Sequence, residues 1–146
     1  MENFDIIGVL QAYASAQNWG FVYGVDAFYK SAQSVGGYLP GQLVLITDFK
    51  ASPRITNGRI QSITYTCLLM LGRKFDLTGL SATLDETSQQ KYDRRIKELM
   101  QMLAAAIAQI ACENNLDLTV NDMIVEINQF AENIDFAVAP NVVFTQ

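Results

Sequence analysis

The most constraining feature of this sequence is an apolar stripe with helical spacing between residues 88 and 114. Its large members step by three and four residues: Tyr92, Ile96, Leu99, Leu103, Ile107 and Ile110. Such steps place side chains on one face of an α-helix. Thr87 and Gln90 have the spacing of a capping box, and Asn114-Asn115 is a suitable stop. The pattern therefore predicts one continuous helix over 88–114 whose stripe packs on another layer.

Two strand patterns precede this helix. Residues 42–50 contain four successive apolar residues, Leu43 to Ile46, which is typical of a central strand. Residues 59–71 are rich in β-branched, aromatic and apolar residues and predict a long strand. Pro53 and Asn57-Gly58 lie between them, so we expect an antiparallel hairpin joined by a loop of about ten residues.

Two further strand patterns follow the helix. Residues 122–130 predict a strand, and residues 131–133 predict a turn. Ile134, Phe136 and Val138 then alternate with Asp135, Ala137 and Ala139, which predicts a half-exposed strand. Pro140 should limit this strand, with Val142 to Phe144 extending as a tail.

The N-terminal part predicts a helix over 4–17, with Asn3 as its N-cap and Gly20 as its stop signal. A short extended segment at 21–23 and a short helix at 26–34 should follow. The order helix, hairpin, long helix, hairpin indicates an α+β fold. We expect an antiparallel sheet of about four strands, with the long helix and the N-terminal helix packed on one face. A chain of 146 residues, 50% hydrophobic and 17% charged, suits a single folded domain spanning 1–146.

Composition excludes several kinds of chemistry. The chain has no histidine, which rules out Ser–His–Asp and Cys–His catalysis and histidine-based zinc sites. Cys67 and Cys112 both lie in apolar runs and are interpreted as core residues. The carboxylates lack calcium-loop spacing, although a carboxylate pair formed in space stays open. We therefore expect no enzyme, no cofactor and no metal site.

Charge and hydropathy also limit the location and the partners. The net charge of −5 disfavours broad nucleic-acid binding. No signal peptide is visible, and the longest apolar run, residues 99–112, is interrupted by Gln101 and Gln109 and is too short to span a bilayer. The sequence therefore predicts a cytoplasmic protein without a membrane partner.

Three cations concentrate in the predicted loop between the first two strands: Lys50, Arg54 and Arg59. A loop of this length with little apolar content should be mobile and exposed. We expect these side chains to contact a neighbouring subunit, an acidic partner or passing DNA. A solvated loop is the alternative.

Two other sets of residues are candidates for interaction. Arg94 and Arg95 make the start of the long helix basic, which opposes the helix macrodipole and indicates a partner, unless Glu98 pairs with Arg94. Trp19 and Tyr23 belong to an aromatic cluster, which suits core packing, an interface or a ligand pocket.

The chain resembles, in order and over nearly its whole length, small tail proteins of tailed bacteriophages and prophages, particularly of Bacteroides-type hosts. The segments that carry the resemblance are Asn18-Trp19-Gly20-Phe21-Val22-Tyr23-Gly24, Tyr38-Leu39-Pro40, the strand 59–71, Lys91-Tyr92-Asp93, Glu126-Ile127-Asn128-Gln129-Phe130 and Asn133-Ile134-Asp135. The order of elements also resembles the tail-terminator fold. This chain departs from the Asn-x-Asp-Gly ending of the group, because Phe136 follows Asp135 where the group has glycine.

The resemblance implies a structural virion protein without a reaction or a cofactor. Tail terminators form a ring, typically a hexamer, at the head-proximal end of the tail. The implied partners are further copies of the chain, the tail tube and the head–neck proteins, with a possible passing contact with phage DNA. The implied location is the virion, and the host cytoplasm during assembly. The alternative is a small-ligand-binding or other non-catalytic α+β interaction domain.

Overall fold

A computed structural model of the chain describes residues 5–24, 38, 39, 41–74, 97–120, 122, 124–128 and 134–146. Its elements are α1 (Ile6–Ala16), β1 (Gly20–Tyr23), β2 (Leu43–Thr56), β3 (Arg59–Lys74), α5 (Lys97–Glu113), β4 (Asp117–Val120), β5 (Ile124–Asn128) and β6 (Ile134–Thr145). Over these residues the strands form a six-stranded sheet in the order β1-β2-β3-β6-β4, with β5 also paired to β6. The α+β class is confirmed, but the sheet has six strands rather than about four, and it is mixed rather than wholly antiparallel.

The sheet is mixed because β1 pairs in parallel with β2, whereas all other pairs are antiparallel. The segment 21–23 is extended as predicted, and it joins the sheet as an edge strand. The helix expected at 26–34 lies outside the described residues. The short strand β4 was not predicted, because all four of its side chains are exposed and it has no buried face to give an apolar pattern.

Both ends of α1 differ from the prediction by a few residues. Asp5, not Asn3, is the N-cap, and its Oδ1 accepts a hydrogen bond from the Gly8 amide at 3.1 Å. Asn18, not Gly20, ends the helix in a left-handed conformation with φ of 60°. Gly20 instead begins β1.

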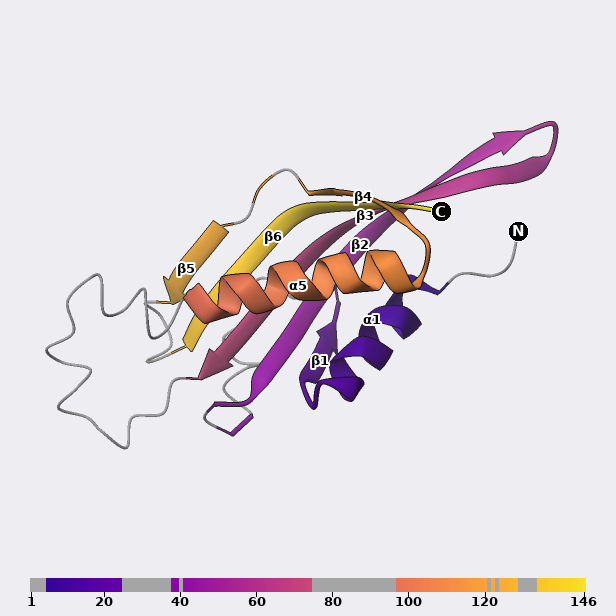
Figure 1. Ribbon diagram of the computed structural model, residues 1–146. Coiled ribbons are helices and arrows are strands. Elements are labelled where there is room, and N and C mark those ends of the chain that lie inside the picture. Colours follow the sequence, from indigo (N-terminus) through magenta and orange to yellow (C-terminus); the bar gives the residue numbers. More distant parts are fainter. Residues whose placement is uncertain are drawn as a thin grey trace, which may run out of the picture.

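The core lies between the sheet and the two helices, which cover the same face (Figure 1). The predicted stripe is confirmed where it is described, since Leu99, Leu103, Ile107 and Ile110 are buried. The start of the predicted helix, including Tyr92 and Ile96, lies outside the described residues. The helix ends at Glu113, and Asn115 takes the expected left-handed conformation with φ of 52°.

Strand β6 is buried on both faces, which corrects the prediction of a half-exposed strand. Residues 135–139 are all buried, because apolar clusters cover both faces of the sheet at this strand. The helix-covered face holds the small residues Ala137 and Ala139. The opposite face carries a second apolar cluster, formed by Val44, Ile46, Met70, Phe136 and Val138. A strand buried on both faces loses the simple alternation of apolar and polar residues.

Pro140 does not limit β6. Cys67 pairs with Val142 and Leu69 with Ala139, so that residues 140 and 141 together oppose Leu68 in a β-bulge. At a bulge a main-chain amide need not donate a hydrogen bond to the neighbouring strand, so proline is tolerated there. The strand continues beyond the bulge to Thr145. The expected tail at 142–144 is therefore an interior part of the sheet.

Candidate functional site

The segment between Lys50 and Arg59 is a β-hairpin, and the expectation of a mobile loop of about ten residues is wrong. Strand β2 continues to Thr56, and only Asn57 and Gly58 form the turn. Their φ values of 54° and 73° are those of a type I′ turn, which matches the twist of the flanking strands. Because asparagine and glycine adopt positive φ readily, the tight turn forms without a longer loop.

The hairpin projects from the body of the molecule as a two-stranded arm (Figure 1). On one side β1 pairs with β2 only as far as Thr47, and on the other β6 pairs with β3 only as far as Thr64. We call residues 50–61 the hairpin arm, and every one of them is exposed. The predicted exposure of Lys50, Arg54 and Arg59 is confirmed.

The strand register gives the hairpin arm two different faces. Arg54 pairs with Ser62 and Ile55 with Ile60, leaving Gln61 as a one-residue bulge. One face carries Lys50, Ser52, Arg54, Thr56 and Arg59, and the other carries Ala51, Pro53, Ile55 and Ile60. The three cations therefore share a face, and Ile55 and Ile60, 62% and 49% exposed, lie opposite each other on the other face.

The outer edge of β2 is poorly suited to pairing with another strand. The Thr47 carbonyl accepts a hydrogen bond from the Gly24 amide across this edge at 3.3 Å. Because main-chain groups alternate sides along a strand, those of residues 49, 51 and 53 point to the same edge. The Phe49 amide donates to its neighbour Asp48 Oδ1 at 2.9 Å. Pro53 has no amide hydrogen. A partner strand would find one donor at these three positions, so along β2 the hairpin arm offers its side-chain faces rather than this edge.

The aromatic candidates Trp19 and Tyr23 lie in different surroundings. Trp19 is half-buried against the core and meets Tyr13 edge-on, with ring centroids 5.6 Å apart. Tyr23 is 50% exposed, and its ring lies 5.9 Å from that of Phe49. Trp19 thus serves in packing, and Tyr23 remains a surface residue beside the base of the hairpin arm.

The basic candidates Arg94 and Arg95 lie outside the described residues. Glu98, which the sequence offered as a partner for Arg94, pairs with Arg73 of β3, with Nη1 and Oε2 3.4 Å apart. This contact ties the first described turn of α5 to the sheet. Because the Glu98 side chain is 58% exposed, the pair adds little to stability.

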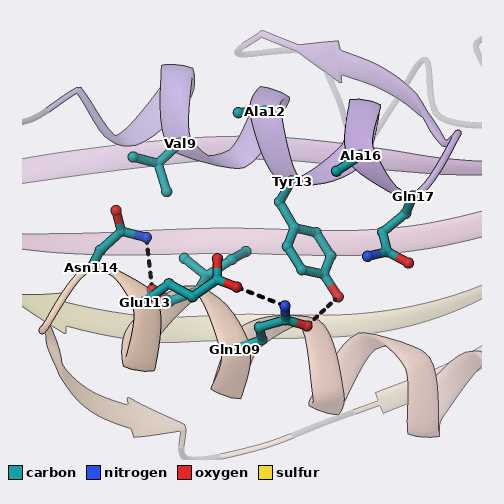
Figure 2. Close-up of a pocket in the computed structure, with 9 residues that line it drawn as sticks. Val9, Ala12, Tyr13, Ala16, Gln17, Gln109, Glu113 and Asn114 are labelled. Atoms are coloured by element: carbon teal, nitrogen blue, oxygen red, sulfur yellow. Dashed lines mark hydrogen bonds between the residues drawn. The ribbon is translucent and has the colours of Figure 1, made fainter.

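A groove of about 260 Å³ lies between α1 and the C-terminal end of α5 (Figure 2). Tyr13 Oη donates to Gln109 Oε1 at 3.4 Å, and Gln109 Nε2 donates to Glu113 Oε1 at 2.7 Å. Partial burial, and secondarily the Glu113 carboxylate, raise the pKa of Tyr13. The lining is completed by Val9, Ala12, Ala16, Gln17, Ile110 and Asn114. Nothing local in the sequence indicates this groove, because its two walls are about a hundred residues apart.

The two cysteines differ, although both were predicted to be core residues. Cys67 is buried in β3, and burial raises its pKa to about 12. Cys112 is exposed, because it lies beside the buried stripe of α5 rather than on it.

Thiol labelling should separate the two cysteines. Iodoacetamide at pH 8 should modify Cys112 and spare Cys67 in the native protein, because the thiolate is the nucleophile and Cys67 stays neutral and inaccessible. Mass spectrometry of tryptic peptides gives the readout, and a denatured sample, in which both thiols react, is the control. Equal labelling rates in the native protein would contradict the burial of Cys67.

Comparisons with protein-family models and with curated proteins give no match to this chain. Among the residues that the structure describes, no group of three or more cysteine or carboxylate side chains is placed to hold a metal ion. Within the same residues, no helix has the length and apolar character needed to cross a bilayer. The hairpin arm is therefore the feature from which a function is best inferred.

Proposed function

We propose that this protein is a structural assembly protein of the tail-terminator type. It forms a homo-oligomeric ring, typically a hexamer, at the head-proximal end of a phage tail, and its partners are the tail tube and the head–neck proteins. Its location is the virion, and the host cytoplasm during assembly. It catalyses no reaction and needs no cofactor, and the cationic face of the hairpin arm is the surface on which passing DNA would make contact.

The observation that carries this proposal is the amphipathic hairpin arm. An isolated two-stranded hairpin is marginally stable in water, so a projecting arm gains most when a partner covers it. Ile55 and Ile60 are among the large apolar side chains that the described surface exposes, and they form one cross-strand pair. Three cations on the opposite face add an electrostatic component that orients a partner. Apolar and charged groups arranged in this way suit contact between proteins.

The alternative of a small-ligand-binding domain has weaker support. The groove between α1 and α5 measures about 260 Å³. Pockets for drug-sized ligands usually measure about 300–1,000 Å³ and enclose most of the ligand. This groove is smaller and open to solvent along the helices (Figure 2).

Replacing both Arg54 and Arg59 by alanine should impair assembly and leave the unfolding midpoint nearly unchanged. Both side chains are exposed, and neither packs in the core. Exposed substitutions of this kind usually change stability by less than about 0.5 kcal/mol. Size-exclusion chromatography with light scattering, alone and with the tail tube protein, measures assembly, and a thermal melt measures stability.

The matched control is Lys97→Ala, which removes an exposed cation from the start of α5, away from the hairpin arm. This variant should assemble like the wild type. A wild-type chain that stays monomeric with and without the tube protein would refute the assembly proposal. So would a catalytic turnover that a single carboxylate substitution abolishes.

A further inference from the structure

We infer that the hairpin arm of one copy docks into the groove between α1 and α5 of the next copy. This inference rests on the proposed function, because it names the contact by which copies join. The hairpin arm and the groove are different surfaces of one molecule, so their pairing is heterologous. A repeated heterologous contact closes into a ring when its rotation allows.

Charge complementarity favours a cationic occupant of the groove. Glu113 lies in the last turn of α5, where the helix dipole is negative and where no basic residue is present. Its Oε1 accepts from Gln109, but no cation of the described chain forms an ion pair with it. A carboxylate at this end of a helix is electrostatically unfavourable, and an arginine from outside would offset that cost. Arg54 and Arg59 supply such a charge on the hairpin arm.

The apolar surfaces also match. Ala12 and Ala16 are small and lie beside Val9 on the α1 wall of the groove (Figure 2), and the buried Ile110 is part of its α5 lining. Because the Ile55–Ile60 pair and the arginines lie on opposite faces of the hairpin arm, the arm would enter tip first, with its apolar face toward the α1 wall and its cationic face toward Glu113 on the α5 wall. Docking would remove both isoleucines from water.

The protected edge of β2 favours this arrangement over strand addition. Asp48 occupies the Phe49 amide, and Pro53 lacks one, so an added strand would find few donors. Docking through side chains needs none of these main-chain groups. Along β2, the faces of the hairpin arm are therefore better suited than the edge to contact with a second copy.

Disulfide trapping tests the contact directly. In a Cys112→Ser background, which leaves only the buried Cys67, the pair Ile55→Cys and Ala12→Cys places one thiol on the hairpin arm and one in the groove. Mild oxidation at high protein concentration should give a ladder of trimers and larger species on non-reducing gels. Each single variant can form at most a dimer. The matched control pairs Ile55→Cys with Gln101→Cys, an exposed position nearer the other end of α5.

Charge reversal provides an independent test. Arg54→Glu with Arg59→Glu should abolish assembly, Glu113→Lys should abolish it too, and the triple variant should regain it. Rescue by the triple variant excludes misfolding as the cause. If the wild type assembles but the ladder and the rescue are absent, the arm-to-groove contact is wrong and the ring proposal stands. If the wild type is monomeric and no ladder forms, both are wrong.

Discussion

Replacing Leu103 by alanine should lower the free energy of unfolding by about 2–5 kcal/mol. Leu103 is fully buried at the middle of α5 and belongs to the cluster that joins both helices to the sheet. Truncation removes apolar contacts and leaves a cavity that surrounding residues fill only in part. Because a domain of this size has about 5–15 kcal/mol of total stability, the variant should melt markedly earlier. Chemical denaturation at low protein concentration measures the loss.

Gln101→Ala is the control for this experiment. Gln101 is exposed on the same helix, and alanine is a good helix former, so the substitution should change stability little. The low concentration matters because an apolar stripe can also serve as a seam between subunits. An unchanged melting point for Leu103→Ala at that concentration would show that the stripe does not form the core of the monomer.

Elements with a local, one-sided pattern could be predicted from the sequence. The stripe of α5 is one-sided because this helix covers a single face of the sheet, and its periodicity therefore survives in the chain. Strand β3 lies between β2 and β6, and its long apolar run is typical of such a central strand. The type of these elements and the burial of Leu99, Leu103, Ile107 and Ile110 followed from spacing alone.

The features that could not be predicted depend on contacts between distant segments. The parallel pairing of β1 arises from where the chain returns to the sheet, which four residues cannot specify. The burial of residues 135–139 of β6 depends on apolar clusters on both faces of the sheet, whose members come from distant segments. The groove beside Glu113 exists only because α1 packs next to α5.

The candidate site shows the same division. The exposure of Lys50, Arg54 and Arg59 was predictable, because a charged segment without apolar periodicity does not enter a core. The shape of the segment was not predictable from Pro53. A proline usually indicates a loop, and it fits a strand only where its position, which lacks an amide hydrogen, faces a free edge of the sheet. Asn57-Gly58 is itself a strong hairpin signal, and it favours a two-residue turn over the longer loop that Pro53 suggests.

Replacing Phe144 by alanine should cost about 3–5 kcal/mol of stability, although the sequence alone predicts a tail at this position. Phe144 is fully buried in β6, beyond the bulge at Pro140, and it pairs across the sheet with Tyr65 of β3 and Leu118 of β4. Its ring belongs to the main core cluster beneath the helices. Its loss should therefore loosen the strands at the base of the hairpin arm.

Asn141→Ala is the matched control for Phe144→Ala, because Asn141 lies on the same strand, within the bulge, and is exposed. It should unfold at nearly the wild-type urea concentration, whereas Phe144→Ala should unfold at a much lower one with a similar slope. Hydrogen exchange adds a local readout, since amides of β3 next to Phe144 should lose protection in the variant. A variant with wild-type stability and unchanged exchange would mean that residues 142–144 are the tail that their sequence suggests. In that case the base of the hairpin arm would be held by β2 and β3 alone, and a two-stranded ribbon is only marginally stable in water.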